Sequence, residues 1–248
     1  IIGRTGFWQC GGAFGFRDQL QDAAALAATD PECTRNMIIK CASRQFKKGD
    51  VLHWWHEGFA DGLPRGVRTM ISDDRLFLPL AACEYAEVSG DAAIFDEQIP
   101  YLVNTEIPYG QQNIYCEMER SDDTETLYEH CCRAVELSFE LRGAHGLPLM
   151  GTGDWNDGMD AVGWDGGESV VVGWLLLLAA RALLPVCKKR GDTARAMLFE
   201  RESAALRAVI ESNAWDKNRY IRAFFGDGTS LGSADCSECA VDCVSECF

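Results

Sequence analysis

The sequence predicts an all-α fold built from helical hairpins. Long stretches carry apolar residues at helical spacing, whereas strand-like alternation is confined to a few residues, with residues 220–225 as the best example. The hydrophobic fraction of 47% over 248 residues supports a substantial core and excludes a disordered chain. Seven segments have the pattern of helices.

Three helices are predicted in the first third of the chain. The first covers residues 17–28, which are rich in alanine and apolar at helical spacing. The second covers residues 31–48, because proline suits the first turn of a helix and Gly49 can end it. The third covers residues 72–90, from a Ser-Asp-Asp cap to a terminal glycine.

Four more helices are predicted downstream. Residues 121–143 again run from a Ser-Asp-Asp cap to a glycine. Residues 168–190 and 192–213 form the next two, separated by Gly191 and with Asp192 as a cap. The seventh begins near Asp235 and continues to Phe248, so the count is odd and a toroid of hairpins would stay open, as in a fragment.

The connections between these helices are unequal. If successive helices are antiparallel, residues 4–16, 49–71, 144–167 and 214–234 emerge at one end, and they hold most Gly-, Trp- and His-rich clusters. The long segment 91–120 has no comparable cluster. This pattern favours a barrel of helical hairpins with a site at its mouth, although a simple bundle would also alternate ends.

Charge and cysteine content limit the function and the compartment. A net charge of -15 repels nucleic acid and anionic lipid, so an anionic substrate must be attracted by local arginines. Residues 1–6 lack the features of a signal peptide, which with twelve cysteines indicates a reducing compartment, and we expect the cytoplasm. The apolar stretch 170–186 contains Arg181 and is short for a membrane span, so we expect a buried helix.

The most informative motif is residues 151–160, which place three carboxylates beside an indole and an amide on a glycine-rich loop. Asp154 and Asp157 could crowd one another next to Trp155, and either effect could keep one carboxyl protonated for donation to a glycosidic oxygen. A solvated turn before a helix is the alternative. The spacing does not fit an EF-hand, which needs acids at alternate positions and a closing glutamate.

A second cluster opens the first predicted helix. Arg17 and Gln21 share one helical face, and Asp18 and Asp22 share the neighbouring face, which is a suitable fork for sugar hydroxyls. A capping network with surface ion pairs explains the same spacing. The preceding glycines are a weak phosphate loop, because the lysine of a P-loop is absent.

Three other clusters allow more than one interpretation. The aromatic residues of 53–56 suit a sugar-binding wall or loop packing better than a metal site. The arginines of 65–69 could face an anion or solvent. The cysteines of the tail fall on one side of a helix, where a buried apolar stripe is favoured over metal binding, because one straight helix cannot surround an ion. The tail cysteines are Cys236, Cys239, Cys243 and Cys247.

Together these motifs resemble a known family. Residues 15–22, 65–74, 145–159 and 227–233 occur in the order found in inverting glycoside phosphorylases of the cellobiose and chitobiose phosphorylase family. They look most like the phosphorylase-like domain of cyclic β-1,2-glucan synthases, over the whole chain. The resemblance implies a six-hairpin (α/α)6 barrel, with residues 1–248 as its N-terminal portion and the C-terminal part missing.

The resemblance also implies roles for individual residues. Asp157 would be the catalytic general acid, and Arg4 would contact phosphate. The sugar-binding set would be Arg17, Asp22, Asp154, Trp155 and Asn156. The family's remaining phosphate ligands would lie later than residue 248, so this chain alone would bind phosphate poorly, and exposed barrel surface would favour a homodimer.

The expected enzyme is a glycosyltransferase of the phosphorylase type that acts on a β-linked oligosaccharide, as part of a larger synthase. Phosphate is the co-substrate, no metal or other cofactor is expected, and nucleic acid is excluded. Phosphate is already an anionic nucleophile, so one acid suffices and a β-glucoside would give α-glucose 1-phosphate. The alternatives are an inverting hydrolase, with Asp22 or Glu168 as base, and a non-catalytic carbohydrate-binding scaffold.

Overall fold

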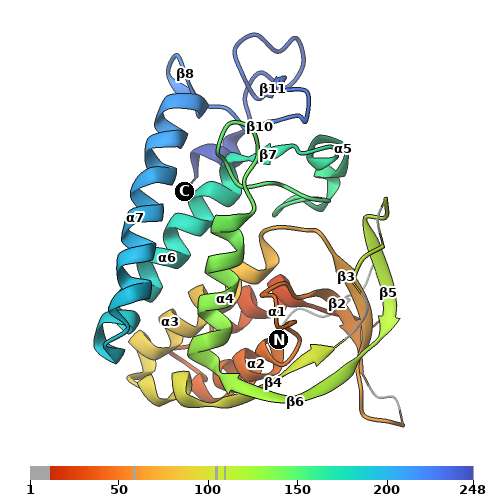
Figure 1. Ribbon diagram of the computed structural model, residues 1–248, viewed down its shortest axis with the longest axis vertical. Helices are drawn as coiled ribbons and strands as arrows, with labels where there is room; N and C mark the ends of the chain where they lie inside the picture. The colour runs from red at the N-terminus through yellow and green to blue at the C-terminus, as the bar shows by residue number, and fades with distance from the viewer. Residues whose placement is uncertain (1–11, 58–59, 104–105, 109, 248) are drawn as a thin grey trace. The chain divides into compact units, whose positions relative to one another are not determined.

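The computed structural model describes residues 12–57, 60–103, 106–108 and 110–247. The chain forms two compact units, one of Ile1–Thr69 and Asp74–Leu137, the other of Met70–Asp73 and Ser138–Phe248. Helices and antiparallel sheets both occur (Figure 1), so the predicted all-α fold is wrong. The strands lie in segments that the sequence pattern assigned to loops or to the start of a helix.

Three helices of the first unit contact one another in pairs. They are α1 (Phe16–Ala24), α2 (Pro31–Ala42) and α3 (Phe77–Ser89). Phe16, Leu20 and Leu78 are fully buried in their core. The Asp30 carboxylate caps α2 by accepting the Cys33 N–H at 3.1 Å, and Gly90 ends α3 in the left-handed conformation that glycine tolerates.

The predicted cap of the third helix is wrong. The N-cap position of α3 is occupied by Leu76, whose side chain makes no capping hydrogen bond, and a short 3-10 turn η1 (Asp74–Leu76) precedes the helix. Ser72 belongs to the second unit, where its backbone N–H donates to the Gly153 carbonyl at 3.1 Å.

An antiparallel sheet accounts for part of the departure from an all-α fold. Its order is β1-β2-β3-β5, and its strands are β1 (Phe14–Gly15), β2 (Leu52–His56), β3 (Arg65–Thr69) and β5 (Asn113–Glu117). Gly66 is paired with Trp55, and a side chain at Gly66 would collide with the Trp54 carbonyl. Glycine therefore marks a close approach between strands here, where the sequence suggested a loop.

A two-stranded sheet precedes the helix α4 (Leu127–Glu140) in the first unit. Strand β4 (Gln98–Val103) follows a 3-10 turn η2 (Ala92–Asp96) and pairs with β6 (Glu119–Thr126). The Ser-Asp-Asp sequence predicted to cap α4 lies within β6, so that boundary was wrong. Strand β6 is polar and largely exposed, and it lacks the alternation by which a half-buried strand is recognised.

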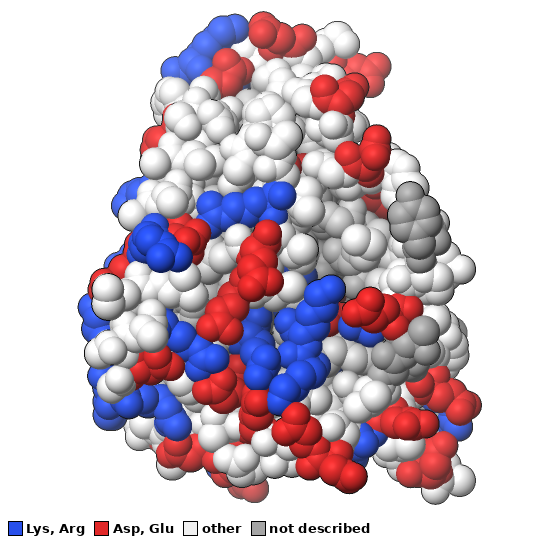
Figure 2. All heavy atoms as spheres, in the orientation of Figure 1, with Lys and Arg blue, Asp and Glu red and all other residues white. Residues whose placement is uncertain are grey.

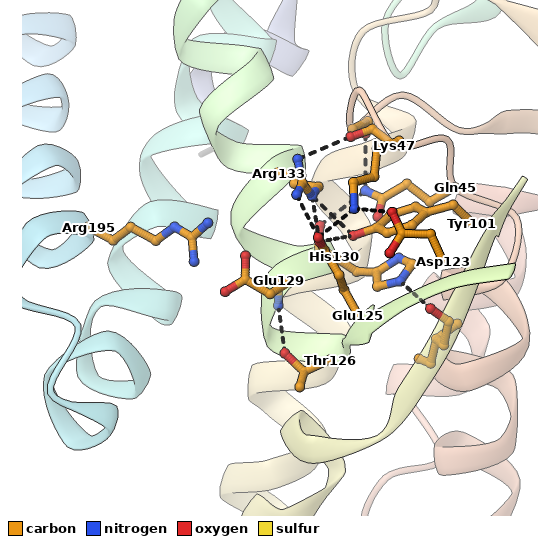
Figure 3. Close-up of polar contacts among 12 residues, drawn as sticks. Gln45, Lys47, Tyr101, Asp123, Glu125, Thr126, Glu129, His130, Arg133 and Arg195 are labelled. Carbon is orange, nitrogen blue, oxygen red and sulfur yellow. Dashed lines mark hydrogen bonds and ion pairs between the residues drawn. The ribbon is translucent and has the colours of Figure 1, made fainter. Parts of the chain in front are cut away.

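Polar contacts connect β6 to its neighbours (Figure 3). The Glu125 carboxylate accepts hydrogen bonds from Arg133 Nε at 2.8 Å, Lys47 Nζ at 2.5 Å and the Tyr101 hydroxyl at 2.8 Å. Burial alone would raise the pKa of Glu125, but these three donors lower it to about 2. Glu125 is therefore charged in the folded unit at neutral pH.

Two long helices dominate the second unit. Helix α6 (Val170–Arg190) packs beside α7 (Thr193–Val209), and a π-helical turn η4 (Ile210–Ala214) follows (Figure 1). Gly191 ends α6 in the left-handed conformation, and the Asp192 carboxylate caps α7 by accepting the Arg195 N–H at 3.1 Å. The predicted boundary between these helices is confirmed.

Helix α6 is also apolar enough to be compared with a membrane span. Within the described part of the chain it is the one helix whose length and hydropathy suffice to cross a membrane, with a mean hydropathy of 2.2. The buried share of its most apolar window is 56%. That share fits the expected core helix, since the buried side packs inside the unit.

Short strands complete the second unit. A sheet of order β11-β10-β7 contains β7 (Glu168–Ser169), β10 (Ala223–Phe224) and β11 (Ser230–Leu231), while β8 (Trp215–Asp216) pairs with β9 (Arg219–Tyr220). The strand signal at residues 220–225 is thus confirmed in part: β9 ends at Tyr220 and β10 covers Ala223–Phe224, but residues 221–222 and 225 are not in a strand. Between α4 and α6 lie a 3-10 turn η3 (Asp157–Met159) and α5 (Asp160–Gly163).

The predicted seventh helix is wrong. Residues 235–247 form turns and a 3-10 turn η5 (Cys243–Glu246), which Asp242 caps by accepting the Val244 N–H at 2.9 Å. Cys239 has a φ of 42°, which interrupts any right-handed helix. Three of the tail cysteines are exposed and Cys236 is half-buried, so the expected buried stripe does not form.

Charged side chains of both signs lie next to one another on the face drawn in Figure 2. Ion pairs between described residues include Arg65 with Glu117 at 2.8 Å and Lys188 with Glu200 at 2.7 Å. No group of three or more His, Cys, Asp or Glu side chains within the described ranges has the geometry of a metal site.

Candidate active site

The motif of residues 151–160 lies on a loop closed by contacts between backbones. The Met150 N–H donates to the Gly167 carbonyl at 2.8 Å where the two ends of the loop meet. A side chain at Gly163 would collide with the Gly151 carbonyl, and one at Gly167 would collide with the Val162 carbonyl. The glycines therefore permit close packing of this loop, and they do not loosen it.

Asp154 holds the loop through hydrogen bonds made by its buried side chain. Its side chain is 0% exposed, and its two oxygens accept from Arg222 Nη2 at 2.6 Å and Nη1 at 2.7 Å. The Ser169 hydroxyl donates to the same carboxylate at 2.6 Å, and the Asn156 backbone N–H donates at 3.0 Å. The predicted carboxylate at this position is thus buried and paired with a cation.

Trp155 and Asp157 are exposed. The Trp155 side chain is 44% exposed, and Asp157 opens the η3 turn at the surface. Between them, the Asn156 side-chain oxygen accepts the Gly158 N–H at 3.0 Å and caps that turn. An aromatic ring and a carboxyl therefore face outward from a backbone that is fixed on both sides of Asp157.

Apolar packing holds the same loop to the strands of the second unit. Met150, Met159, Val162 and Ala223 form a buried cluster, with Phe225 and Leu231 against it. Because Met159 is the last residue of η3, this cluster fixes the turn that carries Asp157.

Arg17 and Asp22 belong to the first unit, on α1. Arg17 is buried, and its guanidinium lies 3.7 Å from an Asp18 oxygen and 4.0 Å from an Asp74 oxygen. The other Asp74 oxygen is 2.8 Å from His53 Nδ1. Asp22 is exposed. These residues form a charged network within their own unit, and Arg4 lies outside the described residues.

Two further groups beside the motif were not predicted as site residues. Arg222 lies in the apolar run 221–225, where a buried arginine signals a carboxylate partner elsewhere in the chain. His145 Nδ1 lies 2.6 Å from a Glu168 oxygen, and its ring stacks on Phe224 with centroids 3.9 Å apart.

Glu168 is one of the two residues that the sequence suggests as the base of a hydrolase. It is 1% exposed and accepts the Leu147 N–H at 2.9 Å and the His145 N–H at 3.1 Å. Its carboxylate is therefore committed to holding the backbone at residues 145–147, an arrangement that does not favour the activation of a water molecule.

Comparison with known proteins gives the motif its context. The chain is 42% identical over 247 residues to the cyclic beta-(1,2)-glucan synthase NdvB of Rhizobium meliloti (strain 1021), which covers 99% of the chain and 9% of that protein. It is 29% identical over 225 residues to the 3-O-beta-D-glucopyranosyl-beta-D-glucuronide phosphorylase of Paenibacillus borealis, covering 90% of the chain and 27% of that protein.

A third relative is the N,N'-diacetylchitobiose phosphorylase of Vibrio furnissii, 27% identical over 261 residues, with 96% of the chain and 29% of that protein covered. The chain thus spans less than a third of each of these three relatives. The model of the glycosyl hydrolase 94 superfamily, catalytic domain, matches residues 1–248. The chain belongs to the glycosyl hydrolase 94 superfamily, within its catalytic domain.

Proposed function

We propose that this chain carries the acid catalyst of an inverting glycoside phosphorylase. The reaction would be phosphorolysis of a β-linked glucoside to α-glucose 1-phosphate. The supporting observation is the exposed pair Trp155 and Asp157 on a loop fixed from beneath by Asp154. Membership of the family and the phosphorylases among the relatives support the reaction class.

Asp157 is the proposed general acid. Its carboxyl donates a proton to the glycosidic oxygen as the bond from that oxygen to the sugar's anomeric carbon breaks. A phosphate oxygen forms the new bond from the opposite face, which inverts the configuration. The leaving sugar takes the proton, and Asp157 regains one from solvent before the next turnover.

The neighbouring residues would bind the sugar. Trp155 offers an exposed ring face for stacking, and Asn156 lies beside it on the loop. Arg17 and Asp22 from α1 are proposed to hydrogen-bond sugar hydroxyls, and Arg4 to contact phosphate. Asp154 is proposed to act by holding the loop, since its oxygens are already bonded to Arg222 and Ser169.

The proposed substrate class is a β-1,2-glucan or a related β-gluco-oligosaccharide. It rests on the similarity to a cyclic β-1,2-glucan synthase along 99% of the chain. The chain would then be one part of a larger synthase and act in the cytoplasm. The net charge of -15 argues against nucleic acid as a partner.

Replacement of the acid tests this proposal. The complete gene product is assayed for sugar 1-phosphate release from β-1,2-, β-1,3- and β-1,4-linked glucosides, with and without phosphate. Asp157→Asn should lower kcat by about 100- to 10,000-fold, because a positioned acid contributes that much to bond cleavage. Asp160→Asn, which removes another exposed carboxylate of the motif, should keep near wild-type activity.

The outcomes separate the three functions. Phosphate-dependent release that Asp157→Asn abolishes supports the phosphorylase and identifies its linkage. Release of free sugar without phosphate would assign the chain to a hydrolase. Sugar binding with no turnover under any condition would leave a non-catalytic scaffold.

A further inference from the structure

Arg222 is a buried cation that the proposed mechanism does not use. Its side chain is 1% exposed, although it lies in a run of apolar residues between β9 and β10. Its two terminal nitrogens reach the two oxygens of Asp154 at 2.6 and 2.7 Å, and its Nε lies 3.2 Å from an Asp242 oxygen. Arg222 therefore joins the motif loop to a segment 88 residues further along the chain than Asp154.

The geometry of this pair depends on a guanidinium. Two parallel N–H groups match the two carboxylate oxygens of Asp154, and the ammonium group of a lysine cannot reproduce that fork. Burial makes the pair sensitive, because the loss of either partner leaves an uncompensated charge away from water. The orientation of the Asp154 carboxylate is thus set by Arg222 and by the Ser169 hydroxyl.

That orientation is transmitted to the residues around Asp157. The Asp154 oxygen held by Arg222 Nη2 also accepts the Asn156 N–H at 3.0 Å. Asn156 in turn accepts the Gly158 N–H at 3.0 Å. Three consecutive hydrogen bonds therefore connect the guanidinium to the backbone on both sides of Asp157.

We propose that Arg222 is a positioning residue for proton donation: through Asp154 it sets where the Asp157 carboxyl meets the glycosidic oxygen. This inference rests on the proposed function of Asp157. A misplacement of about 1 Å can cost on the order of 100-fold in rate, so loss of the fork should be visible in kcat while the chain stays folded.

The test compares two leaving groups. Arg222→Lys is assayed in the complete gene product with the natural β-glucoside and with dinitrophenyl β-glucoside, whose leaving group departs without a proton. We expect kcat for the natural substrate to fall by on the order of 100-fold, with KM for phosphate near wild type. The dinitrophenyl substrate should react within about twofold of the wild-type rate, as it should with Asp157→Asn.

Two further variants guard against a folding defect. Ser169→Ala removes one donor to Asp154 and should show the same dependence on the leaving group, with a smaller loss. Asp242→Asn removes a partner of Arg222 outside the motif loop, and it should leave both rates near wild type. Circular dichroism and thermal unfolding compare the folding of all variants.

Equal losses on both substrates in Arg222→Lys and Ser169→Ala would overturn the inference, because they would indicate general structural damage. Unchanged rates on both substrates in these variants would also overturn it. Failure of the wild-type protein to release sugar 1-phosphate from any substrate would instead refute the proposed function, and this activity is measured first.

Discussion

His130 is a buried histidine whose surroundings favour its neutral form. Its Nε2 lies 3.1 Å from the Ile99 carbonyl, its ring stacks on Tyr101, and its buried Nδ1 has no hydrogen-bond partner within the described residues (Figure 3). Burial lowers its pKa from 6.5 to about 4, although the hydrogen bond to Ile99 opposes the shift. Protonation of Nδ1 would add a buried N–H donor that has no acceptor, beside Nε2, which lies next to the Ile99 carbonyl.

This histidine should make the first unit sensitive to acid. The unfolded chain binds a proton near pH 6.5 and the folded chain only near pH 4, so stability is full above pH 6.5 and falls between these values. The loss amounts to about 3 kcal/mol. Urea midpoints measured from about pH 7 to about pH 5 should fall in the wild type and change less in His130→Phe.

Glu125 contributes a separate loss at lower pH. Its pKa is lowered to about 2 from 4.5, so its contribution is present above pH 4.5 and disappears as the pH falls toward 2. Measurement above about pH 5 therefore keeps the loss from Glu125 out of the comparison, and the difference between wild type and His130→Phe reports on His130. An equal pH dependence in His130→Phe and in the wild type would contradict this assignment.

The placement of the proposed site residues was predictable where they are neighbours in the sequence. Asp157, Trp155 and Asn156 follow one another in the sequence, and the structure places the first two on the surface of one loop. Arg222 was missed because its partner Asp154 lies 68 residues away and no local pattern connects them. The available signal was an arginine within the apolar run 221–225.

At the level of elements, the motif loop depends on backbones that touch. Gly163 has a φ outside the left-handed region, so its conformation suits alanine, but an added Cβ would collide with the Gly151 carbonyl. Gly163→Ala should therefore destabilise the second unit by about 1–3 kcal/mol, because a backbone neighbour cannot rotate away. Urea unfolding of the two proteins measures the difference.

Gly173→Ala is the matched control for this substitution. Its added Cβ would lie 3.1 Å from Cδ1 of Ile210, the flexible end of a side chain, and alanine is the better helix former within α6. Its stability should stay close to that of the wild type. A larger effect at Gly173 than at Gly163 would contradict the role given to backbone contact in the loop.

Helix ends were predicted better than strands, for a physical reason. Gly90, Gly191 and Asp192 satisfy the ends of helices with groups that are local in sequence. Strand pairing is not local: β3 pairs with β5 across more than forty residues, and β6 is too polar to reveal a buried face. The tail cysteines have helical spacing in the sequence, but three of them are exposed in the structure. Helical spacing predicts a helix only where one face of it is buried.

At the level of the whole molecule, α6 is the one helix in the described part of the chain that is long and apolar enough to span a membrane. We propose that α6 is a core helix. Leu176 is fully buried, whereas Leu178, two residues on, is 40% exposed. Leu176→Arg should destabilise the fold by several kcal/mol, because an unpaired charge would be buried, and Leu178→Arg should change stability by less than about 0.5 kcal/mol.

The measurement is thermal unfolding together with the partition of each variant between aqueous and membrane fractions. A membrane-spanning α6 would tolerate neither arginine, since both would face hydrocarbon or a packed helix. Equal loss of folded protein in the two variants would therefore contradict the core assignment. Unequal loss, with Leu178→Arg in the aqueous fraction, would support it.

Family membership holds for the whole chain although the predicted all-α architecture does not. The family model spans residues 1–248, and the motifs that suggested it are short segments distributed over both units. The motifs identified the family more reliably than periodicity predicted the architecture, because a motif is matched residue by residue within a short segment. The strands between the motifs depend on pairing with segments that are distant in the sequence.

Two of the hydrogen bonds of the Ser169 hydroxyl have a consequence for how this sequence can vary. One oxygen accepts the Val172 N–H at the start of α6 and donates to Asp154 under the motif loop. Alanine and glycine can do neither, and a carboxylate could accept but would face Asp154 with like charge. Related sequences should therefore almost always have a hydroxyl-bearing residue at position 169. Where another residue occurs there, Asp154 should be substituted as well.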